Sequence, residues 1–247
     1  MRTRLSAFVF AYFLLAACSW NAAPPDGGAR GLGTRVIGDC HNAAAAARAA
    51  ARSDESWVRA DLDGDGAPDA AGIAKDPRGG SGCTAFFVAE LTGGRTYVRP
   101  LSFPGIQNAP GLPAVVGAAR INQRPGAEVI VAAAAGASTE FVVIFTLARR
   151  GPVAMEISSG PDAGALIPYG GSVAHLDGAA CARRRGIVVL SHAEAPGAAY
   201  RLVRRYYRAR SVTLAPAGAR RSGDVEARDL RRFPEFRGPP FWNCTRA

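Results

Sequence analysis

Residues 58–74 read VRADLDGDGAPDAAGIA, and residues 117–133 read GAARINQRPGAEVIVAA. The two stretches align at an offset of 59 residues, which places Leu62 over Ile121 and Asp69 over Glu128. A second step of 59 residues places EVIV of the later stretch over IVVL at 187–190. Repeats of this length, built from short strands, are typical of β-propeller blades. The alternative is a coincidental alignment in a chain rich in Ala, Gly and Val.

The rest of the chain also favours an all-β fold. Short apolar runs separated by Gly, Pro, Asn and Asp turns predict strands, and they cover 83–91, 96–101, 128–134, 141–147, 186–191, 200–208 and 211–215. Alanine-rich residues 41–52 predict a short N-terminal helix, and a second short helix is expected at 225–232. We therefore expect about three antiparallel four-stranded units, propeller-like, with ring closure left open.

The N-terminus has the features of an export signal. Arg2 and Arg4 precede the apolar run 5–17, which is shorter than the roughly 20 residues that span a bilayer. The run ends in LAAC, which resembles a bacterial lipobox, so we expect cleavage before Cys18 and lipidation of its sulfur. The expected divisions of the chain are a signal peptide (1–17), a flexible tether (18–38), the β-repeat domain (39–215) and a tail packed on it (216–247).

Four further cysteines remain after Cys18, and an even number in an exported chain predicts two disulfides. Four cysteines allow three connectivities. We favour pairing neighbours within each half of the chain, Cys40–Cys83 and Cys181–Cys244. Zinc binding by these cysteines is the weaker alternative, because no C-x-x-C motif occurs and the three histidines lie at no ligand-like spacing from them.

The acidic segment DLDGDGAPD, residues 61–69, is the strongest chemical signal in the sequence. Its carboxylates lie close together on a turn containing two glycines, and they repel one another unless a cation neutralises them. Calcium prefers such oxygen ligands. The expected calcium ligands are Asp61, Asp63, Asp65, the carbonyl of Ala67, and Asp69 directly or through water. An EF-hand is excluded because its twelfth loop position is Gly72, not Glu. A solvated acidic turn is the alternative.

D-x-D-G-D-G-x-x-D entering a strand, repeated at about 60 residues in an exported chain, resembles the FG-GAP (VCBS) repeats of integrin-like propellers. The resemblance covers residues 57–155 and, more weakly, 170–215. It implies antiparallel blades, calcium bracing the loop between a blade's first two strands, and a role in adhesion or binding. In the second unit basic residues and Asn122 replace the ligands, so no calcium is expected there; instead Arg120 and Arg124 are expected to pair with Glu128.

No catalytic motif stands out. Ser172, His175 and Asp177 are the residue types of a hydrolase triad, but on one strand His175 and Asp177 would share a face opposite Ser172. An acid pair drawn from Glu90, Glu140 and Glu156 would support an envelope hydrolase, yet nothing in the sequence singles these residues out. No nucleotide-binding loop is present.

Basic residues concentrate in the C-terminal part: residues 149–247 contain 17 basic and 8 acidic side chains. The expected basic surface comprises Arg183, Arg184, Arg185, Arg201, Arg204, Arg205 and Arg208. For an exported chain the natural partners are anionic envelope polymers or lipid headgroups rather than nucleic acid; plain solvation of exposed strand faces is the alternative. Together these features predict a lipid-anchored cell-envelope protein whose calcium-containing domain is a non-catalytic binding or structural module, with a protein or an anionic polymer as partner.

Overall fold

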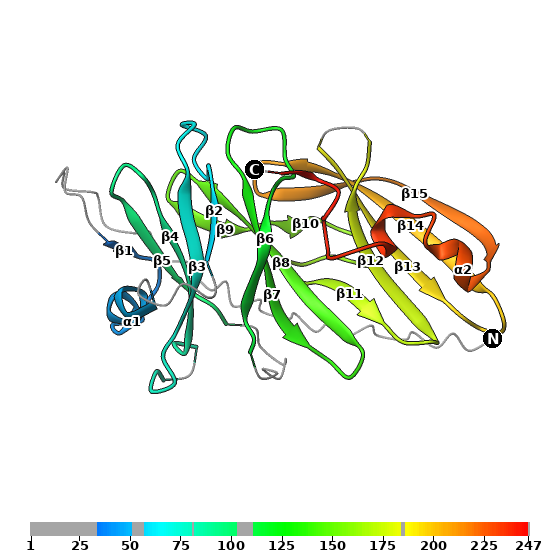
Figure 1. Cartoon of the computed structure of the whole chain (residues 1–247), viewed down its shortest axis with the longest axis horizontal. Helices are drawn as coiled ribbons and strands as arrows, with labels where there is room; N and C mark the ends of the chain where they lie inside the picture. The colour runs from blue at the N-terminus through cyan, green and yellow to red at the C-terminus, as the bar shows by residue number, and fades with distance from the viewer. Residues whose placement is uncertain (1–33, 51–56, 81, 103–110, 184–185, 247) are drawn as a thin grey trace, which may run out of the picture. The chain divides into compact units, whose positions relative to one another are not determined.

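The computed structural model describes residues 34–50, 57–80, 82–102, 111–183 and 186–246. They belong to one compact unit, Leu32–Ala247. The fold is mostly β, with antiparallel sheets and two helices (Figure 1). The prediction of an all-β chain is confirmed at this level. No closed propeller is seen in the part of the chain that the structure describes.

The first sheet has five strands in the order β1-β5-β4-β3-β2. Their bounds are β1 Thr34–Val36, β2 Trp57–Ala60, β3 Asp69–Lys75, β4 Ala85–Glu90 and β5 Thr96–Pro100. Strands β2 to β5 form an antiparallel meander, and β1 adds to β5 in parallel. A four-stranded meander is the unit that the repeat predicted.

The second sheet contains two more meanders. Its order is β10-β15-β14-β13-β12-β11-β8-β7-β6-β16, with β9 paired to β8. The bounds are β6 Ala114–Arg120, β7 Glu128–Ala135, β8 Thr139–Ala148, β9 Gly151–Ala154, β10 Glu156–Ile157, β11 Ile167–Gly171, β12 His175–Cys181, β13 Ile187–Glu194, β14 Tyr200–Arg210, β15 Thr213–Val225 and β16 Thr245–Arg246. Strand β11 pairs with both β8 and β12, so the meanders β6–β9 and β12–β15 share one sheet.

Alternation along β7 divides the core into two parts. Val129 and Val131 pack toward the first sheet, where Phe87 stacks on Phe145 with ring centroids 4.5 Å apart. Ile130 points the other way, into a second cluster formed with β8, β12, β13, β14 and β15. Strand β7 is buried on both faces, which explains its continuous apolar sequence.

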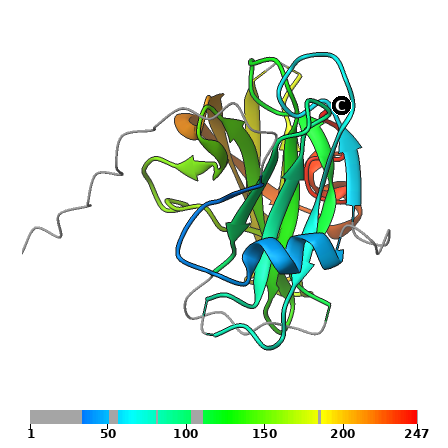
Figure 2. The same ribbon diagram turned by 90° about the vertical axis from the view of Figure 1, so that its left-hand side faces the viewer.

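Helix α1 (Ala43–Ala50) packs against the first sheet (Figure 2). Ala43, Ala46 and Ala47 are buried against Phe86 and Val98. Their methyl groups let the helix approach the sheet closely, and the prediction of a short alanine-rich helix is confirmed. Among the described residues, no helix has the length and apolarity needed to span a membrane.

The C-terminal segment lies against the second sheet. It contains α2 (Ala227–Leu230) and the 3₁₀ turn η2 (Pro234–Phe236). Two hydrogen bonds join Asn243 to the backbone of Cys181, at 2.9 and 2.8 Å. Both expected disulfides are present: Cys40–Cys83 joins the start of α1 to the segment before β4, and Cys181–Cys244 joins β12 to the tail.

Two expected boundaries differ from the structure. Residues 34–37, assigned to the tether, are part of the fold, because β1 pairs with β5 and the Ile37 N–H donates to the Val98 carbonyl. The boundary at 215/216 falls inside β15, which continues to Val225 because β14 supplies a long partner strand. The leader and Cys18 lie outside the described residues.

Candidate metal centre

The acidic segment forms the loop between β2 and β3. One carboxylate oxygen from each of Asp61, Asp63 and Asp65 can be chosen so that all three lie within 4.8 Å of one another. Asp61 is partly buried, and the other two are exposed. The structure therefore brings together three of the four expected carboxylate ligands on one short turn.

Each of the three carboxylates uses one oxygen to shape the loop. Asp61 Oδ1 accepts the Gly64 N–H at 2.7 Å. Asp63 Oδ1 accepts the Asp65 N–H at 3.2 Å, and Asp65 Oδ1 accepts the Ala67 N–H at 2.7 Å. Each residue has a second carboxylate oxygen, and hard oxygens of this kind are the ligands that calcium prefers.

The electrostatics of the loop favour a bound cation. Partial desolvation raises the pKa of the exposed Asp63 carboxyl, and the negative charges of Asp69, Asp65 and Asp61 raise it further, against the lowering effect of the hydrogen bond from the Asp65 N–H. A divalent ion would relieve this repulsion. The donor set and its charge therefore fit calcium, with Asp61, Asp63, Asp65 and the Ala67 carbonyl as the residues that would hold it.

Asp69 differs from these three aspartates because its carboxylate is buried and hydrogen-bonded to the backbone. Its side chain is buried, and it does not belong to the group of three carboxylates. Asp69 Oδ2 accepts the Leu62 N–H and Oδ1 accepts the Thr92 N–H, both at 2.8 Å. The carboxylate thus fixes the two ends of the loop and joins it to the turn after β4. These contacts give Asp69 a structural role, and its role as a calcium ligand stays a prediction.

The loop between β6 and β7 has the same arrangement, in which a buried carboxylate accepts backbone N–H groups at the start of the loop. Glu128 is buried, and its Oε2 accepts the Ile121 N–H at 2.7 Å and the Asn122 N–H at 3.2 Å. Ile121 and Glu128 are the residues that the 59-residue offset aligns with Leu62 and Asp69. Glu128 Oε1 accepts a hydrogen bond from Thr146 Oγ1 at 3.3 Å, where Asp69 has a backbone donor. The alignment thus corresponds to equivalent contacts in space.

The expected pairing of Arg120 and Arg124 with Glu128 is wrong. Arg120 Nη2 lies 3.7 Å from Asp61 Oδ2, so its charge faces the first loop. Arg124 Nη1 donates to Ser211 Oγ at 2.8 Å. Glu128 is buried beneath its own loop, where backbone N–H groups and a hydroxyl group donate hydrogen bonds to its carboxylate. Neither arginine pairs with it.

The two loops also contact each other. The Ala127 N–H donates to the Asp61 carbonyl at 2.7 Å. A Cβ built on Gly64 would lie 2.4 Å from Pro125 Cβ, and one built on Gly126 would lie 2.5 Å from the Leu62 carbonyl oxygen. Glycine is required at both positions because the loops approach so closely. The acidic loop is therefore supported from one side by its own repeat counterpart.

Strand alternation distributes the expected basic surface over two faces. Arg201 and Arg205 lie on the face of β14 that carries Tyr207 into the core, and Arg204 and Arg208 lie on the other face. Arg204 pairs with buried Glu235 at 2.6 Å, and Arg205 pairs with Asp162 at 3.3 Å. Exposed Arg183 precedes β13, and Arg184 and Arg185 lie outside the described residues.

We expected Ser172 on the same strand as His175, on the opposite face, but the structure places it elsewhere. It is in the turn before β12, and its Oγ lies 3.4 Å from His175 Nδ1. His175 Nε2 is 2.9 Å from Thr139 Oγ1 but 4.0 Å from Asp177 Oδ2, beyond hydrogen-bond range. These three residues do not form a hydrogen-bonded triad. The candidate acid residues Glu90, Glu140 and Glu156 lie on β4, β8 and β10.

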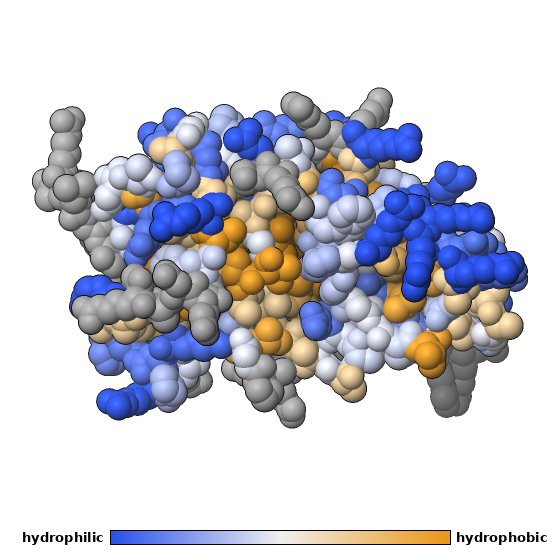
Figure 3. Space-filling model, in the orientation of Figure 1, coloured by the Kyte–Doolittle hydropathy of each residue, from blue (hydrophilic) through white to orange (hydrophobic). Residues whose placement is uncertain are grey.

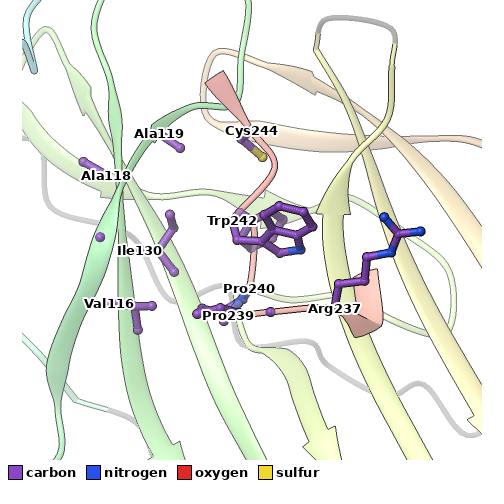
Figure 4. Close-up of a pocket in the computed structure, with 12 residues that line it drawn as sticks. Val116, Ala118, Ala119, Ile130, Arg237, Pro239, Pro240, Trp242 and Cys244 are labelled. Atoms are coloured by element: carbon purple, nitrogen blue, oxygen red, sulfur yellow. The ribbon is translucent and has the colours of Figure 1, made fainter. Parts of the chain in front are cut away.

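An apolar groove of about 490 Å³ separates β6 from the C-terminal segment (Figure 4). Val116 and Ile130 line one side, and Pro239 and Trp242 line the other. The Trp242 indole is half-exposed, and its Nε1–H donates to the Pro234 carbonyl at 2.8 Å. Apolar side chains gather in the middle of this face, and hydrophilic ones gather over β14, β15 and α2 (Figure 3).

Comparison with known proteins found no match to this chain: no family model, no curated protein and no solved structure is significantly similar.

Sequence reasoning missed two polar clusters that depend on strand pairing. Arg204 and Ser191 both hydrogen-bond to buried Glu235, 31 and 44 residues away in the sequence. His192 Nδ1 lies 2.8 Å from Asp177 Oδ1. The register of β12 with β13 would have revealed the second cluster, but no local motif encodes that register.

Proposed function

We propose that this protein is an exported, lipid-anchored component of the cell envelope, and that its β-repeat domain is a non-catalytic binding or structural module braced by calcium. The observation that carries the proposal is the loop of Asp61, Asp63 and Asp65, whose carboxylate oxygens come within 4.8 Å of one another. Calcium held there would stiffen the connection between β2 and β3.

The equivalence of the two loops supports an FG-GAP-like origin for the domain. Leu62 and Asp69 make the same backbone-to-carboxylate contact as Ile121 and Glu128. Three four-stranded meanders follow one another in the chain. We propose that they descend from one propeller-like repeat, of which only the first unit keeps the calcium ligands.

A thermal melting series tests the calcium role. Calcium should raise the melting temperature of the purified protein relative to chelator. A concentration 100 times the dissociation constant adds about 2.7 kcal/mol to the free energy of unfolding. Asp63→Ala should lower the melting temperature and abolish the calcium effect, whereas the control Asp224→Ala, at an exposed position on β15, should preserve it. Equal melting temperatures for the wild type in calcium and in chelator would reject the proposal.

Attachment to the membrane is tested separately, on Cys18. Cys18→Ala should move the protein from the membrane fraction to the soluble fraction, because two or three acyl chains hold a protein far more firmly than one. Asp63→Ala should remain in the membrane fraction. Retention of Cys18→Ala in the membrane fraction would remove the lipid anchor from the proposal and leave the calcium module untouched.

A second candidate function is binding of anionic envelope polymers by an arginine-rich face. Exposed Arg208 and Arg220 lie on one face of the sheet, because Arg208 shares the face of Arg204 on β14 and Arg220 is the cross-strand partner of Arg204 on β15. Exposed arginines gathered on one face create a positive potential that attracts a polyanion. Binding of such a polymer must weaken as salt rises; an affinity that does not change between low and high salt would exclude this function.

A further inference from the structure

Strand β6 is fully paired along one edge and only partly paired along the other. β7 pairs with the first edge over residues 114–119, and β16 pairs with the second edge at Ala119 and Arg120. In the part of the chain that the structure describes, no strand pairs with the second edge along residues 114–118. In an antiparallel pair, every second residue directs its N–H and C=O away from the partner strand. The second edge of β6 therefore presents backbone donors and acceptors to which a further strand could pair.

The apolar groove lies beside this edge (Figure 4). Val116, Gly117 and Ala118 of β6 line one side, and Pro239 and Trp242 of the C-terminal segment line the other. Three large hydrophobic side chains are exposed among the described residues, and two of them are Val116 and Trp242. Exposed apolar side chains that gather at one place mark an interaction site, whereas isolated ones do not.

Gly117 leaves space in the groove. The register pairs Gly117 with Ile130, and cross-strand partners share a face, so both residues contribute to the lining. No atom lies within 4 Å of a Cβ built on Gly117. The groove volume of about 490 Å³ falls within the range of about 300–1,000 Å³ that is typical of ligand sites. A short segment of extended chain therefore has room beside β6.

The unpaired edge distinguishes between two kinds of apolar occupant. A hydrocarbon chain, such as that of a lipid, would cover the outward N–H and C=O groups of β6 without offering them a hydrogen bond, which is unfavourable for buried polar groups. An extended peptide satisfies the same groups when it adds to the sheet as a strand. The chain itself uses this edge in that way, because β16 pairs with Ala119 and Arg120. A peptide therefore suits the groove better than a lipid.

The charge of the groove selects among peptides. Among the described residues that line it, Arg237 alone is charged. The Arg237 side chain is exposed, and its guanidinium donates hydrogen bonds to the carbonyls of Arg231 and Arg232 rather than to a carboxylate. A positive charge that is not neutralised by a carboxylate attracts an acidic side chain.

We propose that the second edge of β6 and the groove beside it bind an extended peptide segment of another protein. The segment adds a strand to β6 along residues 114–118, places apolar side chains between Val116 and Trp242, and carries an acidic residue on the side of Arg237. The site includes neither the acidic loop nor Cys18, so it is independent of the function proposed above.

Selection from a library of random heptapeptides tests the proposal, with the wild type as target and Gly117→Val for counter-selection. A valine at 117 would fill the groove beside Ile130 and should weaken binding of an enriched peptide by at least about tenfold. The matched control is Gly223→Val on β15, because a Cβ built on Gly223 also has no atom within 4 Å. Fluorescence polarisation of the labelled synthetic peptide should give the same affinity for Gly223→Val and the wild type.

Modified peptides test strand pairing on the wild type, so this measurement does not depend on the folding of a variant. Only alternate residues of an added strand face β6. Methylation of every second backbone nitrogen of the peptide should therefore weaken binding at least about tenfold in one phase and much less in the other.

The charge is tested by changing the acidic residue of the peptide to its amide. The change should weaken binding to the wild type by about two- to fivefold and should have no effect on binding to Arg237→Gln.

Four results would overturn the proposal: no peptide enriched over Gly117→Val, equal losses in Gly117→Val and Gly223→Val, equal effects of the two methylation phases, or enriched peptides that bind Arg237→Gln and the wild type alike. Palmitate is the probe for the alternative occupant. Binding of palmitate to the wild type but not to Gly117→Val, without any enriched peptide, would assign the groove to a lipid.

Discussion

The loops 61–69 and 120–128 occupy equivalent positions in two successive meanders, yet they differ in what balances their charge. In both, a buried carboxylate from the start of the following strand accepts backbone N–H groups at the start of the loop. The first loop adds three clustered aspartates, and the second has Asn122 and two arginines in the aligned region. The comparison shows that the carboxylate at 69 or 128 holds the start of the loop in both meanders, while only the first loop gathers three carboxylates at its tip.

Asp69→Asn should have the largest effect on stability. The amide nitrogen would face a backbone N–H, so a buried donor would lose its acceptor, and we expect the free energy of unfolding to fall by about 3 kcal/mol. Urea denaturation in chelator measures this without a contribution from calcium. The same change at Asp224, which is exposed, should alter stability by less than about 0.5 kcal/mol. Equal stability of the two variants would mean that Asp69 does not hold the loop.

The contact between the loops is tested by two glycines with nearly the same φ angle. Gly64 has φ +84° and Gly66 has φ +89°. A methyl group at Gly64 would collide with Pro125, whereas no atom lies within 4 Å of one at Gly66. Gly64→Ala should therefore cost about 2–3 kcal/mol and Gly66→Ala about 1 kcal/mol, from backbone strain alone. Chemical denaturation of both variants compares them, and equal losses would argue against close packing of the loops.

Glu128→Gln separates the charge of the second carboxylate from its shape. Burial raises the pKa of Glu128, against the lowering effect of hydrogen bonds from Ile121, Asn122 and Thr146. Because the folded pKa exceeds the unfolded one, the unfolded state loses its proton first. Stability contributed by this group therefore falls as pH rises from about 4 toward the folded pKa.

Gln keeps an acceptor for the two N–H groups and can donate to Thr146, so the variant should lie within about 1 kcal/mol of the wild type at pH 4. At pH 7 the free energy of unfolding of Glu128→Gln, relative to that of the wild type, should be higher than at pH 4. Urea denaturation at both pH values gives the difference, with exposed Glu140→Gln as control. A difference from the wild type that is the same at pH 4 and pH 7 would contradict the raised pKa.

Arg120→Ala should have the smallest effect on stability, about 0.5 kcal/mol or less, because the Arg120 side chain is 50% exposed and its ion pair is long. It should nevertheless tighten calcium binding by about fivefold, since opposite charges about 4 Å apart in water interact by about 1 kcal/mol. Arg124→Ala, whose side chain hydrogen-bonds to Ser211 instead, is the matched control in the calcium titration. Equal affinities of the two variants would show that Arg120 does not compete with the ion.

The sequence contained enough local information to predict the strands and to align the loops 61–69 and 120–128. Apolar runs such as 141–147 and 200–208 fall within β8 and β14, and the 59-residue offset aligns residues that make equivalent contacts. Both disulfides followed from pairing neighbouring cysteines. These features depend on residues close together in the sequence or on a simple periodicity.

Other features depend on contacts that no local pattern encodes. Asp69 was expected to be a ligand because it belongs to the acidic motif, but its burial and its bond to Thr92 arise only when the turn after β4 packs on the loop. Arg120 and Arg124 were assigned to Glu128 by proximity in sequence. The register of β12 with β13, which brings His192 to Asp177, could be read only from the folded sheet.

Calorimetric titration of the purified protein with millimolar Ca²⁺ tests the calcium loop most directly. We expect heat of binding that fits one site per chain in the wild type, and loss of that heat in Asp63→Ala. A wild-type titration without heat, together with an unchanged melting temperature, would contradict it.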